Sequence, residues 1–138
     1  MFRRAAVLLP AVAVSLRLRG FAKTREALQA KLDRVLPWEG DAKSEAELVE
    51  RACRMVKAAS RYGAIRATCL EESLTLWYLV KKQGVAVSLR IGVRKVQDKL
   101  EAHAWVEHGG VALGQAEELH RHYAAFDDKL LESSGEKR

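Results

Sequence analysis

The fold is decided by residues 69–93, which read CLEESLTLWYLVKKQGVAVSLRIGV. In the first half, apolar residues recur every three or four positions, which predicts an amphipathic helix that begins at Cys69. Gly84 marks the end of that helix. From Val85 onward every second residue is apolar, which predicts a strand with one buried face.

The following residues predict two more strands and a last helix. Apolar and polar residues alternate over residues 100–107. The pair Gly109-Gly110 signals a tight hairpin before a short strand at residues 111–113. Residues 116–132 carry apolar side chains on one side and predict a helix.

The residues upstream predict helices. Residues 3–19 and 21–35 each have helical apolar spacing. Ser44 followed by Glu47 is a capping-box pattern and predicts a helix over about residues 45–60. Helices that precede an antiparallel meander indicate an α+β fold rather than a parallel sheet.

The chain of 138 residues is long enough for one domain. We expect an N-terminal helical arm at residues 1–40, a main domain at residues 41–132 and a frayed tail at residues 133–138. The formal net charge is +6. The arm holds eight Lys or Arg against three Asp or Glu and so carries +5 of it. This charge suits an acidic partner or a phospholipid surface, or it solvates an exposed helix face. Nucleic acid is not expected as a partner, because no aromatic residues are interleaved with the basic ones.

The N-terminus imitates a secretory signal. Arg3 and Arg4 precede an apolar run of about 12 residues, which is too short to span a bilayer. Arg17 and Arg19 follow where a signal peptide would have small residues. We therefore expect a helix of the mature protein that docks on the domain or on a partner.

The cysteine and histidine spacing does not predict a disulfide framework or a zinc site. Cys53 falls on the apolar side of a predicted helix, where a buried, inert thiol is usual. His120 and His122 are two residues apart and would point in different directions on a helix. No metal or organic cofactor is expected.

Cys69 opens its predicted helix, and that position favours nucleophilic chemistry. The thiolate is the form that attacks a carbonyl carbon, and the positive end of a helix dipole stabilises it. The backbone N–H groups of Cys69 and Leu70 are suited to hold an oxyanion. The alternative is that Cys69 is a small buried residue.

His103 is predicted on the second strand, on the face that it shares with Trp105 and opposite the buried apolar residues. A packed, hydrogen-bonded core histidine is the alternative. A cysteine on a helix followed by a histidine on an antiparallel strand is the order that papain-type and transglutaminase-type thiol enzymes use. The order therefore favours Cys69 and His103 as nucleophile and base.

Two strings carry a more specific resemblance. Residues 69–74 have the pattern C-L-x-x-S-L, and residues 102–107 read A-H-A-W-V-E before the glycine hairpin. Together they resemble the transglutaminase-like cysteine peptidases that remove leaders from lasso-peptide precursors. The resemblance implies a papain/transglutaminase-like fold, with the helix of Cys69 packed on a small antiparallel sheet, and places the peptidase domain at residues 41–132.

The resemblance also implies site roles. Cys69 is the nucleophile and His103 is the base. The family has an Asp about a dozen residues past the histidine, and the matching position here is Gln115. A neutral amide can hold the imidazole tautomer but stabilises imidazolium less than a carboxylate. Glu117 or Glu118 is the alternative third member.

The implied partners are a precursor peptide as substrate, a separate leader-recognition protein and a lasso cyclase later in the pathway, in the bacterial cytoplasm. Gln115 leaves a second reading open, a catalytically weak module that binds the precursor or a partner. An amidase or transamidase is also open, because it would share the acyl-enzyme step.

Overall fold

The computed structural model describes residues 2–62, 68–113 and 124–125. Four helices precede a four-stranded antiparallel sheet with strand order β3-β2-β1-β4. The elements are α1 (Phe2–Arg19), α2 (Phe21–Leu32), α3 (Ala42–Tyr62), α4 (Cys69–Lys82), β1 (Ser88–Val96), β2 (Lys99–His108), β3 (Val111–Ala112) and β4 (Ala124–Ala125). The predicted α+β class is confirmed.

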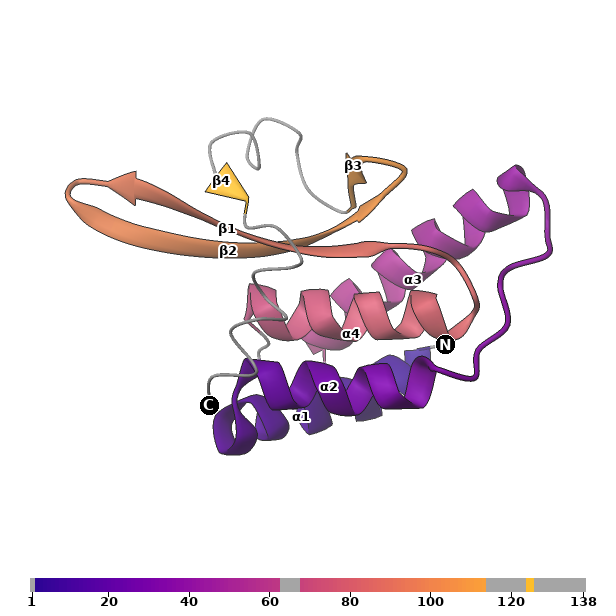
Figure 1. The fold of residues 1–138 in the computed structure, drawn as a ribbon, viewed down its shortest axis with the longest axis horizontal. Helices are drawn as coiled ribbons and strands as arrows, with labels where there is room; N and C mark the ends of the chain where they lie inside the picture. The colour runs from indigo at the N-terminus through magenta and orange to yellow at the C-terminus, as the bar shows by residue number, and fades with distance from the viewer. Residues whose placement is uncertain (1, 63–67, 114–123, 126–138) are drawn as a thin grey trace.

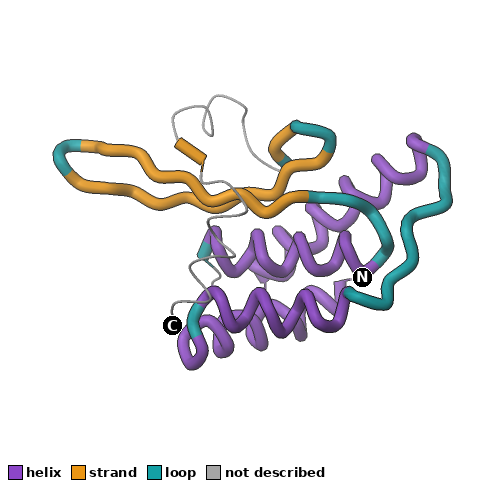
Figure 2. Tube along the Cα trace, viewed as in Figure 1, coloured by secondary structure: helices purple, strands orange, loops and turns teal. Residues whose placement is uncertain are grey.

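The elements form layers (Figure 1). The long β1–β2 hairpin lies above α4, and α1 and α2 lie on the side of α4 away from the sheet. The tube view shows the same arrangement, with α1, α2 and α4 on one side of the hairpin and the start of α3 reaching the level of the sheet (Figure 2). Because α4 contacts three helices and two strands, it is the centre of the molecule.

Helix α4 is buried on nearly all sides, since it packs between the other helices and the sheet. All but one of its residues from Glu71 to Val80 are buried, and Leu74, Trp77 and Val80 are at most 1% exposed. A helix surrounded in this way needs apolar residues around its whole circumference. Its sequence LTLWYLV supplies them.

Helix α1 joins the same core. Ala5, Leu9 and Val12 are buried in the cluster that also contains Leu74 and Trp77. Pro10 lies inside α1 and does not end it.

Two boundaries, the start of α3 and the start of β1, differ from the sequence expectation. Helix α3 begins at Ala42, because the Oδ1 of Asp41 accepts the N–H of Ser44 at 2.7 Å. The predicted cap at Ser44 was therefore wrong. Strand β1 begins at Ser88, where its pairing with Glu107 of β2 starts.

The helix predicted over residues 116–132 is wrong at Ala124 and Ala125, which form β4 and pair with Val93 and Gly92. The free edge of β1 offers backbone hydrogen bonds that local apolar spacing does not report. The remaining residues of that predicted helix lie outside the described part of the chain, as does the predicted frayed tail.

Candidate active site

Thr68 sets the first turn of α4 through a capping box. Its hydroxyl accepts the N–H of Glu71 at 3.3 Å, and the Glu71 carboxylate accepts the N–H of Thr68 at 2.9 Å. This reciprocal pair fixes the helix start and places Cys69 as its first residue. The predicted start of this helix is confirmed.

The capping box leaves two backbone donors at the helix start. The N–H of Glu72 bonds the Thr68 carbonyl, and that of Glu71 is taken by the Thr68 hydroxyl. Within the described residues no hydrogen bond takes up the N–H groups of Cys69 and Leu70. Both residues are only partly buried. The helix dipole adds positive potential here, so this turn is suited to a developing negative charge.

His103 lies in the middle of β2, opposite Gly92 of β1. It shares a strand face with Trp105 and Glu107, while Ala104 and Val106 point to the other face. The imidazole stacks on the Trp105 ring, with centroids 5.8 Å apart and planes at 25°. His103 is half-buried, whereas Trp105 is only 2% exposed.

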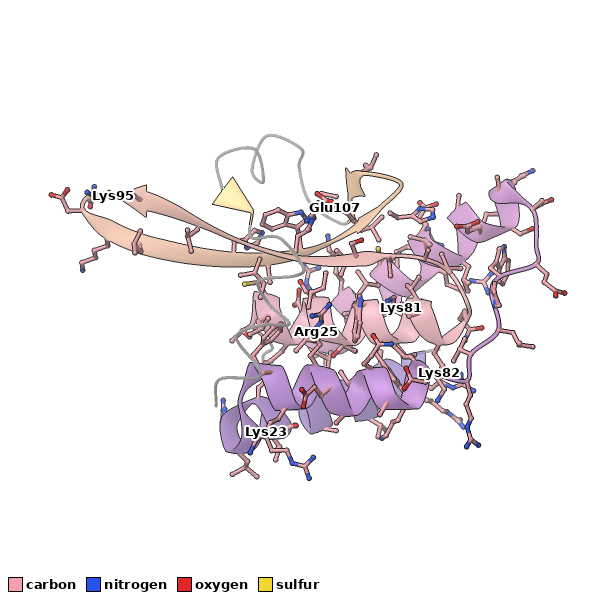
Figure 3. The ribbon with its side chains drawn as sticks, viewed as in Figure 1. Lys23, Arg25, Lys81, Lys82, Lys95 and Glu107 are labelled. Atoms are coloured by element: carbon pink, nitrogen blue, oxygen red, sulfur yellow. The ribbon has the colours of Figure 1, made fainter. Side chains whose placement is uncertain are left out.

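Trp105 is itself held in place. Its indole N–H donates to Oε1 of Glu107 at 3.1 Å, and the Nε of Arg90 on β1 donates to Oε2 of the same carboxylate at 3.1 Å. Figure 3 labels Glu107 on the sheet, on the side away from the helices. Arg90, Glu107 and Trp105 thus form a connected network, and the Trp105 ring of that network stacks on His103. The network limits the orientations that the imidazole can adopt.

Ser73 joins the two elements that carry Cys69 and His103. Its buried hydroxyl donates to the carbonyl of Ala104 at 3.0 Å. Ser73 is one helical turn past Cys69, and Ala104 is the residue next to His103. The carbonyl of Val106, two residues further along β2, accepts the N–H of Leu113 and so marks the same strand edge. The start of α4 therefore packs against this edge of β2, beside His103.

A small cavity of about 60 Å³ lies next to this junction. Ser73, Trp105 and Cys53 are among its lining residues. Burial raises the pKa of the Cys53 thiol. Cys53 is partly buried rather than fully buried, and it packs against the core.

The other predicted site residues fall outside the described part of the chain. These are Gln115, Glu117 and Glu118, together with His120 and His122. Among the described residues, no three His, Cys, Asp or Glu side chains gather as metal ligands. No helix in the described ranges has the length and apolar content needed to cross a bilayer.

A cysteine that opens a central helix, tied to a histidine-bearing antiparallel strand, defines the class of papain-type and transglutaminase-type folds. The sequence model of the transglutaminase-like superfamily matches residues 6–126. The chain belongs to the transglutaminase-like superfamily, which includes cysteine peptidases. Neither the curated proteins nor the solved structures gave a match.

Sequence reasoning missed the supporting residues. Ser73 was part of the quoted pattern, but helical spacing does not reveal that its hydroxyl reaches β2. Glu107 follows Trp105 by two residues, which does place both on one strand face. That spacing was a usable signal for the indole–carboxylate bond.

Proposed function

We propose that this chain is a cysteine peptidase that removes the leader from a ribosomally made lasso-peptide precursor. Cys69 is the nucleophile and His103 is the base. The observation that carries the proposal is the hydrogen bond from Ser73 to Ala104, because it fixes the helix of Cys69 against the strand of His103.

The reaction starts with transfer of the Cys69 thiol proton to His103. The sulfur attacks the scissile carbonyl carbon, an S–C bond forms, and the negative oxygen is held by the N–H groups of Cys69 and Leu70. The C–N bond then breaks as His103 protonates the leaving amine. Water, deprotonated by His103, attacks the thioester, releases a carboxylic acid and restores the thiol.

Gln115 is the proposed third member, accepting the second imidazole N–H of His103, with Glu117 as the alternative. The stacked ring of Trp105 restricts the orientation of the His103 imidazole. The substrate is delivered by a separate leader-recognition protein, and the cleaved core passes to an ATP-using cyclase. These partners rest on the sequence resemblance.

Mass spectrometry of a cleavage reaction tests the proposal. The full chain is incubated with a lasso-precursor peptide and a leader-recognition protein, and the masses of the products are measured. We expect leader and core fragments from the parent protein and none from Cys69→Ala or His103→Ala. Binding without cleavage by the parent protein would instead indicate a binding module. Loss of ammonia or a cross-link would indicate a transamidase.

A further inference from the structure

Helix α1 is apolar on two sides, although only one of them faces the core. Ala5, Leu9 and Val12 are buried against α3 and α4. A second set is exposed and recurs at alternating steps of four and three residues. It consists of Val7, Ala11, Val14 and Leu18. Val7 is 73% and Leu18 is 80% exposed, so the core does not account for this stripe.

One end of the stripe opens into a groove of about 480 Å³ between α1 and α4. Its apolar lining combines both helices and consists of Val7, Leu8 and Ala11 from α1 and Tyr78 and Leu79 from α4. The groove is therefore a concave continuation of the exposed stripe. Spacing of three and four residues is the pattern that accepts the side chains of a second helix.

The groove is bordered by cations. Arg3, Arg4 and Lys82 line it, and no carboxylate is among its described lining residues. The sequence of α1 contains no Asp or Glu. The ammonium of Lys82 lies over the Tyr78 ring at 5.6 Å, which holds one of these charges at the groove. Figure 3 labels Lys82 at the end of α4 where β1 follows.

We propose that the groove and the stripe, from Arg3 to Leu18, bind an amphipathic helix with acidic flanks that belongs to a partner protein. Apolar side chains of that helix enter the groove and cover Val7, Val14 and Leu18. Its carboxylates pair with Arg3, Arg4 and Lys82. This inference is independent of the peptidase reaction.

Two other occupants fit less well. A membrane surface would select large aromatic or Leu side chains on a convex helix, whereas this site is concave and its stripe is mainly Val and Ala. A second copy related by a two-fold axis would place the same basic surface against itself, which like charges oppose.

The groove lies at the end of α4 that is far from Cys69. Lys82 lies thirteen positions after Cys69, which is about 20 Å along the helix axis. Side chains that enter the groove would therefore lie far from the start of α4.

A designed peptide tests the proposal on the full chain. The probe is a fluorescent helix of about three heptads with Leu at the two core positions and Glu at the flanking ones. We expect saturable binding by fluorescence anisotropy that weakens with added salt. The variant Arg3→Glu/Arg4→Glu/Lys82→Glu should lower the affinity at least about tenfold, since three attractive contacts become repulsive. Leu18→Glu, at an exposed position, should also weaken binding.

Arg54→Glu, at an exposed position of α3, is the matched control and should change affinity less than about twofold. A peptide with Lys in place of Glu should not bind. Equal binding of the Glu and Lys peptides, no binding of either, or unchanged affinity in the triple variant would overturn the proposal. So would binding to anionic vesicles in place of the peptide, or self-association that Leu18→Glu abolishes.

Discussion

The two thiols, Cys53 and Cys69, differ in their surroundings. Desolvation raises the pKa of Cys53 and disfavours its thiolate. Cys69 instead opens a helix whose first N–H groups have no hydrogen-bond acceptor among the described residues. We expect iodoacetamide at neutral pH to label Cys69 at least about tenfold faster than Cys53. Peptide mass spectrometry over time measures both rates. Faster labelling of Cys53 would contradict this account of the helix start.

The raised pKa of Cys53 also makes stability depend on pH. In the unfolded chain the thiol ionises near its ordinary pKa of about 8.5, whereas in the folded protein it stays protonated to higher pH. The folded state then binds more protons, so stability should fall as pH rises above that ordinary value. Urea unfolding across this range should show a smaller decline in Cys53→Ala. An identical decline in both proteins would disprove the linkage.

Trp105 positions His103 through its ring and its indole N–H. Trp105→Phe keeps most of the stacked ring and removes the hydrogen bond to Glu107. We expect kcat for precursor cleavage to fall by about three- to tenfold with little change in KM, because the loss affects ring orientation rather than substrate binding. Glu50→Gln, at an exposed carboxylate of α3, should have no effect. A change in KM alone would count against a positioning role.

At the residue scale, the start of one helix could be predicted from the sequence and the start of another could not. The position of Cys69 followed from local chemistry, since Thr68 and Glu71 form the cap within four residues. The cap of α3 was misassigned because Asp41 and Ser44 are both good capping residues, and only backbone geometry decides between them.

At the scale of elements, the junction between α4 and β2 depends on one buried hydroxyl, that of Ser73. Ser73→Ala removes the donor to the Ala104 carbonyl and should cost about 1 kcal/mol of unfolding free energy. Because the start of α4 is then less firmly held beside His103, kcat should also fall. Denaturant unfolding and cleavage kinetics measure the two effects.

Thr75 on the same helix provides the matched control. Its hydroxyl bonds the Glu71 carbonyl within α4 and does not reach the sheet. Thr75→Val should change stability but leave kcat close to that of the parent protein. If Thr75→Val and Ser73→Ala reduce kcat equally, the hydroxyl of Ser73 has no special role in joining the two elements.

Elements with a strong local pattern were predictable, and elements made by long-range pairing were not. The change in apolar spacing after Gly84, from every three or four residues to every second one, predicted α4 and the β1–β2 hairpin that follows it. The hairpin turn at Gln97 and Asp98 has positive φ angles of 48° and 64°, which a two-residue turn requires. Strand β4 forms only because the edge of β1 is available, which its own residues do not show.

At the scale of the whole molecule, α1 contributes to the common core. Leu9 is 4% exposed among the residues that surround α4. Leu9→Ala should cost about 2–5 kcal/mol because it leaves a cavity. Val7→Ala, at a 73% exposed position of the same helix, should be nearly neutral. Thermal unfolding compares the two, and equal stability would show that α1 is not part of the cooperative core.

The overall fold could be predicted because its order of helices and strands is written in apolar spacing. The candidate site could be predicted only in part. Cys69 and His103 were found from residue type and order, but the contact between their elements depends on packing between residues 31 apart. The third member, Gln115 or Glu117, stays a prediction.

The most direct test of the account measures whether His103 activates Cys69. In a Cys53→Ala background, the rate of Cys69 alkylation is determined at about neutral pH in the parent protein and in the histidine variants. His103→Ala should slow the alkylation at least about tenfold. His108→Ala is the control: His108 lies at the end of β2 and pairs with Glu45 of α3, so its loss should not slow the alkylation. Equal rates in the parent and His103→Ala proteins would contradict the nucleophile–base pair.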